Sequence, residues 1–312
     1  MTHQAMTFAS TIDCWDLDAV YAFADGWNQA QALAKKCRAQ LGRFDVHRFP
    51  DGETLVSAVP SEGITGRVVA IYRSLYDPNA KLIEVLFAAN ALRSLGAAKV
   101  ILIAPYMPYM RQDRAFQPGQ AISQEAIGHF LAAQFDGIVT IQPHLHRTLS
   151  LSSIFGSTPA LTIKAGHAIA ADLRAAGNPA NIIVGPDEES EELVREVVDV
   201  LGASWFVARK ARHGDNDVTI ELPPGLEIRG KSVVIVDDIV SSGGTVITLA
   251  KALKRAGVGD ITVYAVHALF DQRAALLMQR AGVSTIKSLS TVPHTTNAIP
   301  IVDIIFSGLG VN

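Results

Sequence analysis

The residues best suited to chemistry lie between positions 237 and 245, where two carboxylates precede a loop of small and hydroxylated residues. The backbone N–H groups of such a loop can point into one concavity and bind a phosphate together with the hydroxyls. Adjacent carboxylates would repel that phosphate unless they bind the hydroxyls of a ribose or a cation. The segment therefore predicts a ribose 5-phosphate site, although the loop alone also fits an ordinary strand-to-helix turn. Its candidate ligands are Asp237, Asp238, Ser241, Ser242, Gly243, Gly244 and Thr245.

Two regular elements must hold this loop. Residues 233–236 are apolar and β-branched without alternation, which predicts a parallel strand covered on both faces and places the acidic pair at its carboxyl end. From Val246 to Leu253 apolar residues recur at i, i+3, i+4 and i+7, so a helix begins directly after the loop, and Gly257 is placed to end it. The positive end of the helix dipole then faces the loop.

Three further segments in the first half of the chain carry candidate binding groups. Residues 49–53 read FPDGE, where Phe49 offers a flat face and Asp51 and Glu53 offer acceptors, but the segment alone is also a simple turn. Residues 111–114 read RQDR, and two such arginines can bind a polyphosphate bidentately or form a solvated ion-pair cluster. His144 follows the strand-like run at 137–141, where an imidazole could reach a metal or a phosphate or be structural.

Composition limits the classes of protein that fit. The chain has 312 residues, 49% hydrophobic and 18% charged, which is enough for two cores of ordinary size. A net charge of −3 gives no general attraction to nucleic acid or anionic membrane, so we expect neither as a partner. Two cysteines, no leader pattern and no apolar run near ~20 residues predict a soluble cytoplasmic protein that is not exported.

Short apolar runs alternate with helical patterns along the chain, which predicts an α/β fold built on mostly parallel sheets. Residues 92–106 match residues 253–267 in glycine position and hydrophobic phase, so we expect two similar halves; duplication and a chance likeness of two such units both explain the match. Only the second half keeps the sugar-phosphate loop. We place the boundary where Ser, Gly and Pro gather, giving domains 1–152 and 153–312.

Taken together, FPDGE, RQDR, the strand-end histidine and the sugar-phosphate loop occur in the order found in the phosphoribosyl diphosphate synthetases, also called ribose-phosphate diphosphokinases, and the chain resembles that family. The resemblance runs from about Val20 to the C-terminus and leaves residues 1–18 as an extension. It implies two phosphoribosyltransferase-like domains, each a mostly parallel sheet flanked by helices, with ATP bound by the first and ribose 5-phosphate by the second.

The resemblance also implies residue roles. The ATP-binding residues would be Phe49, Asp51, Gly52, Glu53, Arg111, Gln112 and Arg114. Mg²⁺ would be bound by His144 and Asp187, and the catalytic basic pair would be Lys210 and Arg212. In the reaction, the C1 hydroxyl of ribose 5-phosphate attacks the β-phosphorus of ATP and AMP leaves, so positioning and cations do the work. The polar run at 214–217 suits closure over the reaction, although the basic segment before it also fits a solvated turn.

Several positions depart from the family pattern. Ser241 and Ser242 stand where relatives carry an acidic or amide residue and Thr, and Glu188 and Glu189 stand where many relatives have glycine. Gln142 stands where relatives often have an acid beside the metal histidine. The stretches QPGQAIS, HALF and TVPHTTNAI favour a divergent member nearer the archaeal-type enzymes.

Two other functions stay open from the sequence. A non-catalytic regulatory homologue would be expected to lose the basic pair or the metal ligands, and a salvage phosphoribosyltransferase would lack FPDGE and RQDR. The family likeness also implies a homo-oligomer, a dimer or a multiple of dimers, whose ATP site is completed by a neighbouring subunit. The apolar run before RQDR, residues 105–110, is the contact we expect to be buried there.

Overall fold

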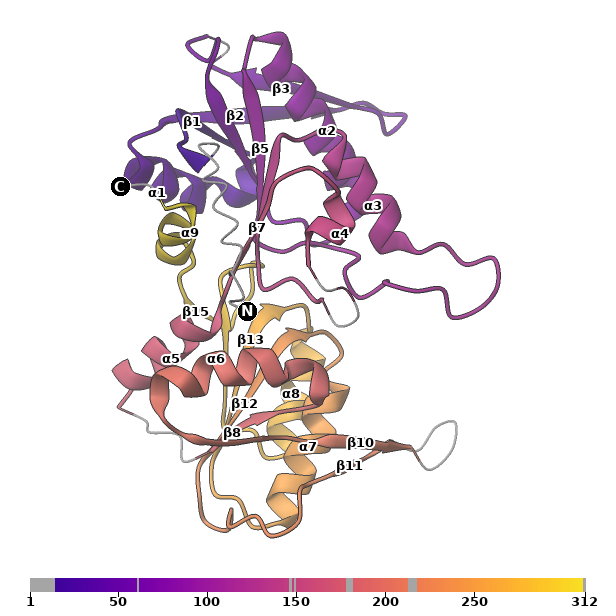
Figure 1. Cartoon of the computed structure of the whole chain (residues 1–312), viewed down its shortest axis with the longest axis vertical. Coiled ribbons are helices and arrows are strands. Elements are labelled where there is room, and N and C mark those ends of the chain that lie inside the picture. The colour runs from indigo at the N-terminus through magenta and orange to yellow at the C-terminus, as the bar shows by residue number, and fades with distance from the viewer. Residues whose placement is uncertain are drawn as a thin grey trace, which may run out of the picture.

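The computed structural model describes residues 15–60, 62–145, 148, 150–177, 182–212 and 218–310, with backbone alone at 210–212 and 218–219. Two α/β halves lie end to end along the long axis, the N-terminal half at the top of Figure 1 and the C-terminal half below it. Each half is a mainly parallel sheet with helices on its faces. The predicted fold class is confirmed, while most of the predicted extension, residues 1–14, lies outside the described residues.

The N-terminal sheet has the order β3-β2-β1-β4-β5-β6-β7, and β3 alone is antiparallel to its neighbour. Its strands are β1 (Ala19–Ala22), β2 (Gln40–Arg48), β3 (Thr54–Val59), β4 (Val68–Tyr72), β5 (Lys99–Ala104), β6 (Gly137–Ile141) and β7 (Ala160–Ile163). The helices between them are η2 (Ala24–Gly26), α1 (Trp27–Cys37), α2 (Pro78–Ser94), α3 (Ser123–Ala132) and α4 (Ser152–Phe155). Parallel strands buried on both faces account for the unbroken apolar runs of β4 and β5.

The C-terminal sheet is parallel throughout, with the order β15-β14-β13-β12-β8-β9. Its strands are β8 (Ile182–Gly185), β9 (Ser204–Val207), β12 (Val233–Val240), β13 (Ile261–Ala268), β14 (Thr285–Leu289) and β15 (Asn297–Ile299). The antiparallel pair β10 (Arg209–Arg212) and β11 (Val218–Glu221) is separate from this sheet. The helices are α5 (Gly166–Ala175), η3 (Glu188–Ser190), α6 (Glu191–Leu201), α7 (Gly244–Arg255), α8 (Gln272–Arg280) and α9 (Val302–Leu309).

The two halves share one connectivity. In each, six parallel strands follow the spatial order second, first, third, fourth, fifth, sixth, as β2-β1-β4-β5-β6-β7 and as β9-β8-β12-β13-β14-β15. In each, antiparallel structure is inserted in the chain between the second and the third of these strands. In the first half it is β3, which forms a hairpin with β2, and in the second half it is the hairpin of β10 and β11. The prediction of two similar halves is confirmed, and their origin by duplication stays a prediction.

The sheets divide the chain later than the sequence suggested. Strand β7 pairs with β6 and so belongs to the first sheet, which takes the chain to Ile163, past our expected boundary at residue 152. The chain then returns at its end, because α9 packs on α1 and an ion pair of 2.7 Å joins Lys36 to Asp303. The domain division itself stays a prediction, but the C-terminal helix lies beside the N-terminal half (Figure 1).

One apolar core crosses the junction between the halves. It contains Ile141 and Ile163 from the first sheet together with Val236 and Val266 from the second, all less than one-tenth exposed. Burial of such side chains stabilises the contact by roughly 1.5–3 kcal/mol each. The junction is therefore a packed interface that can hold a site in a fixed geometry. Within the described part of the chain, no helix is long and apolar enough to cross a membrane.

Candidate active site between the two halves

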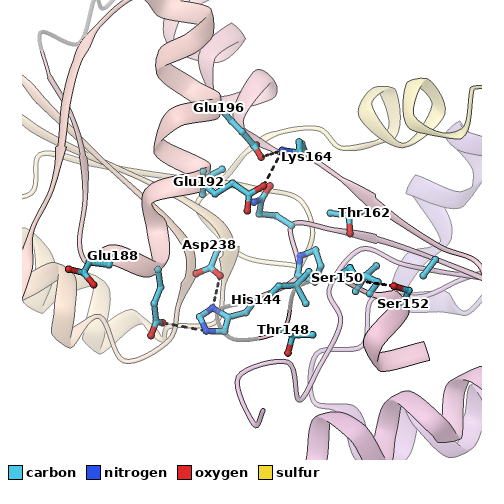
Figure 2. A pocket seen from close by; sticks show the side chains of 17 residues that line it. His144, Thr148, Ser150, Ser152, Thr162, Lys164, Glu188, Glu192, Glu196 and Asp238 are labelled. Carbon is cyan, nitrogen blue, oxygen red and sulfur yellow. Dashed lines mark hydrogen bonds and ion pairs between the residues drawn. The ribbon is translucent and has the colours of Figure 1, made fainter. Parts of the chain in front are cut away.

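A cavity of about 600 Å³ lies at the carboxyl edge of both sheets. His144 enters it from the segment after β6, Asp238 from β12, and Glu188 and Glu189 from η3. Figure 2 shows His144 and Asp238 facing each other at one end, with Lys164 near Glu192 and Glu196 at the other. Carboxyl ends of parallel strands are the usual place for ligands in α/β folds. The cavity is the candidate active site.

His144 is held between two carboxylates. Its Nδ1 lies 2.7 Å from Asp238 Oδ2, and its Nε2 lies 3.4 Å from Glu189 Oε2. Burial of the imidazole works to lower its pKa, but the hydrogen bond and charge of Asp238 and the charge of Glu189 outweigh burial, so the pKa of His144 is raised. For the same reason the pKa of Asp238 is lowered, although its burial opposes this. The pair is therefore stabilised in its charged form.

The acidic pair and the small-residue loop follow the predicted order with one difference. Strand β12 continues to Val240, so Asp237 and Asp238 lie inside the strand and the loop begins only at Ser241. Gly243 has a left-handed φ of 73° and precedes α7, which starts at Gly244. A helix N-terminus beside hydroxyls has the geometry that binds anions, and phosphate binding at this loop stays a prediction.

A contact from the first half reaches this loop. Arg111 Nη1 donates a hydrogen bond of 3.2 Å to Ser241 Oγ, so the first residue of RQDR and the first residue of the loop lie side by side. Arg111 and Gln112 also line a second cavity of about 610 Å³, together with Tyr106, Tyr109 and Ile239. At this cavity the RQDR segment of the first half therefore faces β12 of the second half.

The remaining residues of that segment point elsewhere. Arg114 stacks on Phe116 with its guanidinium carbon 4.7 Å from the ring centroid, and Phe116 is 65% exposed. Met107 and Met110 of the preceding apolar run are 2% exposed because they pack in the core of their own half. The expectation that this run is a subunit contact was therefore wrong for its two methionines.

FPDGE forms the turn between β2 and β3. Phe49 N–H donates to the Glu53 carbonyl at 2.8 Å, Glu53 N–H donates to Asp51 Oδ1 at 3.1 Å, and Gly52 takes a φ of 93°. The turn follows β2, which is four places from β6 in the sheet order, or roughly 19 Å at about 4.8 Å per strand. Within one chain, therefore, the turn does not reach His144.

Lys210 and Arg212 lie on β10, where they pair in register with Ile220 and Val218. Figure 1 shows the β10–β11 hairpin projecting sideways from the C-terminal sheet. Their side chains, and the polar run at 214–217, lie outside the described residues.

Asp187 follows β8, the strand next to β12, so it stands at the predicted edge. Its carboxylate accepts a hydrogen bond of 3.2 Å from the Glu189 N–H and caps η3. Glu188 and Glu189, which the sequence marked only as departures, are the residues of this segment that line the main cavity. Asp187, Glu188 and Glu189 all follow the buried strand β8 closely, and polar residues at such a place are the sequence signal for a site at the edge of the sheet.

The donors suit a weakly held hard cation. Among the described residues, no three His, Cys, Asp or Glu side chains are placed to hold a metal ion. Mg²⁺ keeps several waters and needs few protein side chains, so a site with few protein ligands fits this ion. His144 and Asp187 are the groups that, by the family resemblance, would hold it.

The sequence did not single out two residues at the junction. His267 on β13 is 1% exposed and contacts the backbone at the end of β6, and Lys164 after β7 lies 3.1 Å from both Glu192 and Glu196. Lys164 stands next to no recognisable motif, and His267 begins the stretch HALF, which indicated only the archaeal-type likeness and gave His267 no role. A histidine within an apolar strand was the one signal that could have found His267.

The fold and the loop define a protein of the phosphoribosyltransferase-like class. Residues 153–302 match the phosphoribosyl transferase domain, and residues 21–134 match the N-terminal domain of ribose phosphate pyrophosphokinase. The chain belongs to the ribose-phosphate pyrophosphokinase family, as the predicted resemblance indicated.

Curated relatives and a solved structure agree with this assignment. The ribose-phosphate pyrophosphokinase of Methanopyrus kandleri is 33% identical over 277 residues, which cover 88% of this chain and 92% of the relative. The ribose-phosphate pyrophosphokinase of Halobacterium salinarum is 34% identical over 265 residues, which cover 84% of this chain and 90% of the relative. Both organisms are archaea, in line with the predicted archaeal-type likeness. The fold also matches the crystal structure of phosphoribosylpyrophosphate synthetase from Mycobacterium smegmatis, with a TM-score of 0.79, 20% identity and coverage of 94% and 97%.

Proposed function

We propose that the protein transfers the diphosphoryl group of ATP to the C1 hydroxyl of ribose 5-phosphate, giving phosphoribosyl diphosphate and AMP. The observation that carries the proposal is the 3.2 Å hydrogen bond from Arg111 to Ser241. It joins the segment proposed to bind the polyphosphate to the sugar-phosphate loop of the other half. Transfer of a diphosphoryl group requires its donor and its acceptor to lie side by side in this way. Names of the relatives support the same activity.

Each group then has a task set by its place. The loop from Ser241 to Thr245 binds the 5-phosphate through N–H groups and hydroxyls, and the carboxylates of Asp237 and Asp238 accept from the ribose hydroxyls. Arg111 binds the donor's phosphates, with Gln112 beside it. Mg²⁺ near His144 would neutralise phosphate charge when bound. Lys210 and Arg212, on the projecting hairpin, would meet charge that develops on the transferred group.

Specific residues argue against the other two functions. A non-catalytic regulatory homologue would be expected to have lost the basic pair or the metal ligands. In this chain His144, Asp187, Lys210 and Arg212 are all present. A salvage phosphoribosyltransferase has no use for an additional N-terminal half that contributes Arg111 to the sugar-phosphate loop.

The ATP site, as proposed, is completed by a second copy of the chain. Five residues of β2, 44–48, extend past its pairing with β1 and pair only with β3, so the FPDGE turn stands roughly 17 Å beyond the end of β1. Phe49 on this turn is 41% exposed, and Leu55, Ile83 and Phe87 on β3 and α2 are also exposed apolar residues near it. A second subunit covering them would bring FPDGE to a neighbour's site. A cytoplasmic location stays a prediction.

The direct test is an assay with ATP, Mg²⁺ and ribose 5-phosphate that measures AMP and the diphosphorylated sugar. Equal amounts of both products support the proposal, and ADP or free phosphate as the main product would contradict it. The shared site is tested by mixing the Arg111→Ala and Phe49→Ala variants after dissociation. Hybrids should regain activity if the two residues act from different chains, and no gain over the separate variants would contradict that part.

A further inference from the structure

The backbone immediately before His144 is strained. Gln142 has a left-handed φ of 39°, a conformation that costs a non-glycine residue free energy. Two hydrogen bonds made by Gln142 itself hold this conformation. The Gln142 N–H donates to the Ile163 carbonyl at 3.0 Å, and the Gln142 side-chain oxygen accepts from the Ala165 N–H at 3.0 Å. This turn sends the chain from the end of β6 into the cavity.

A third contact comes from the other half. His267 Nε2 lies 3.1 Å from the Ile141 carbonyl oxygen and 3.2 Å from that of Gln142. Since both neighbours are acceptors, Nε2 must carry the proton. Its Nδ1 lies 2.9 Å from Thr291 Oγ1, and the ring packs edge-on against Tyr106 at 5.0 Å, so the imidazole has little freedom to turn.

We infer that Gln142 and His267 are positioning residues, which hold the strained turn so that His144 faces Asp238 across the junction. The Gln142–His267 contact is the only one of the turn's three supports that comes from the half carrying the sugar-phosphate loop, within the described residues. It therefore fixes the donor-side histidine relative to the acceptor side. The inference rests on the proposed function, in which His144 serves the metal–nucleotide.

The test compares nucleotide binding with and without metal. ADP is titrated calorimetrically into each variant in Mg²⁺ and in EDTA, and the ratio of the two dissociation constants measures how much the metal helps. His267→Phe removes the contacts of Nε2 with both carbonyls and that of Nδ1 with Thr291, but keeps a ring beside Tyr106. Its metal ratio should fall about tenfold, as for loss of a residue that orients a metal-binding histidine. His267→Gln can still donate to the carbonyls and should recover most of the ratio.

Two variants separate positioning from general damage. Tyr264→Phe, on the same strand, loses a buried hydrogen bond to Asp172 and should keep the wild-type ratio. Thr291→Val removes the Nδ1 partner, together with a hydrogen bond of 2.6 Å from Thr291 Oγ1 to the Val266 carbonyl, and leaves both contacts of Nε2 in place. It should lower the ratio less than His267→Phe does, which provides a second reading if His267→Phe does not fold.

The outcomes distinguish the inference from the function it rests on. If His144→Ala abolishes the metal ratio while both His267→Phe and Thr291→Val keep it, the positioning role is refuted and the proposed function stands. If Tyr264→Phe lowers the ratio as much as His267→Phe, the effect is structural and the inference is equally refuted. If His144→Ala leaves the ratio unchanged, the metal role of His144 fails, and the positioning role with it.

Discussion

Acid should weaken the folded state through His267. Its imidazole is 1% exposed, and burial lowers its pKa to about 4, against 6.5 in an unfolded chain, although the charge of Asp238 and the carbonyls of Gln142 and Ile141 oppose the shift. The charge of His144 also lowers the pKa of His267, by less than the other causes. The folded state therefore holds His267 neutral over a range in which the unfolded state binds a proton.

The sign and size follow from this difference. Because the unfolded state binds more protons between pH 6.5 and about 4, the stabilisation is complete above pH 6.5 and is lost as the pH falls toward 4. At 1.36 kcal/mol per pKa unit, the full loss is about 3 kcal/mol, of which about 2 kcal/mol is reached by pH 5. That is a large part of the free energy of unfolding of an ordinary protein.

The assay is urea unfolding of the wild type and His267→Gln at pH 7.5 and pH 5. Gln cannot titrate, so subtracting its change with pH removes the contribution of the other groups. We expect the free energy of unfolding of the wild type to fall by about 2 kcal/mol more than that of the variant. Parallel pH dependences for the two proteins would refute the assignment of a neutral buried His267, and Tyr264→Phe, which keeps the histidine, should behave as the wild type.

Three other perturbations test the site. Lys210→Ala should lower kcat at least about a hundredfold in steady-state assays and leave ribose 5-phosphate binding nearly intact, because the ammonium serves the transition state; equal losses would assign it to substrate binding. Gly243→Ala should destabilise by about 1–2 kcal/mol in urea unfolding and weaken ribose 5-phosphate binding, because φ is 73° and a Cβ would lie 3.3 Å from Met278; a neutral effect would contradict the role of this conformation. His144→Ala and Asp187→Ala should each raise the Mg²⁺ concentration for half-maximal activity, and lower activity at unchanged Mg²⁺ dependence would contradict their metal role.

The elements around the sugar-phosphate loop were predictable because local rules and tertiary packing agree there. The run Val233–Val236 has no polar face, so only a strand covered on both sides suits it, and the helix after Gly243 follows an apolar stripe of period 3.6. The antiparallel turn at Gly52 was predicted as a turn. The hairpin around it was missed, although Phe44 and Val46 alternate with polar residues along β2, as a strand with one buried face requires.

The contacts between the halves could not be predicted from the sequence. Strand β7 and helix α9 belong to the first half only through pairing with β6 and packing on α1, which no local pattern encodes. The extension of β12 through Asp237 and Asp238 is likewise tertiary, because pairing with β13 holds two carboxylates in a strand that they do not favour. His267 contacts two carbonyls that lie 126 and 125 residues away in the chain, so no local pattern predicts this contact.

The two groups of predicted residues that lie away from the cavity share one structural origin. FPDGE stands on the hairpin inserted after the second strand of the first half, and Lys210 and Arg212 stand on the hairpin inserted at the equivalent place in the second half. In the first half β3 joins the sheet as its antiparallel edge strand, whereas in the second half β10 and β11 form a separate pair, so the two insertions differ while the shared strands are kept. As proposed, the first half uses its hairpin to reach another chain, and the second uses its own to bring the cationic groups of Lys210 and Arg212 to the diphosphate. The repeated sheet can thus hold His144 and Asp238 in one fixed geometry, while the two inserted hairpins vary around them.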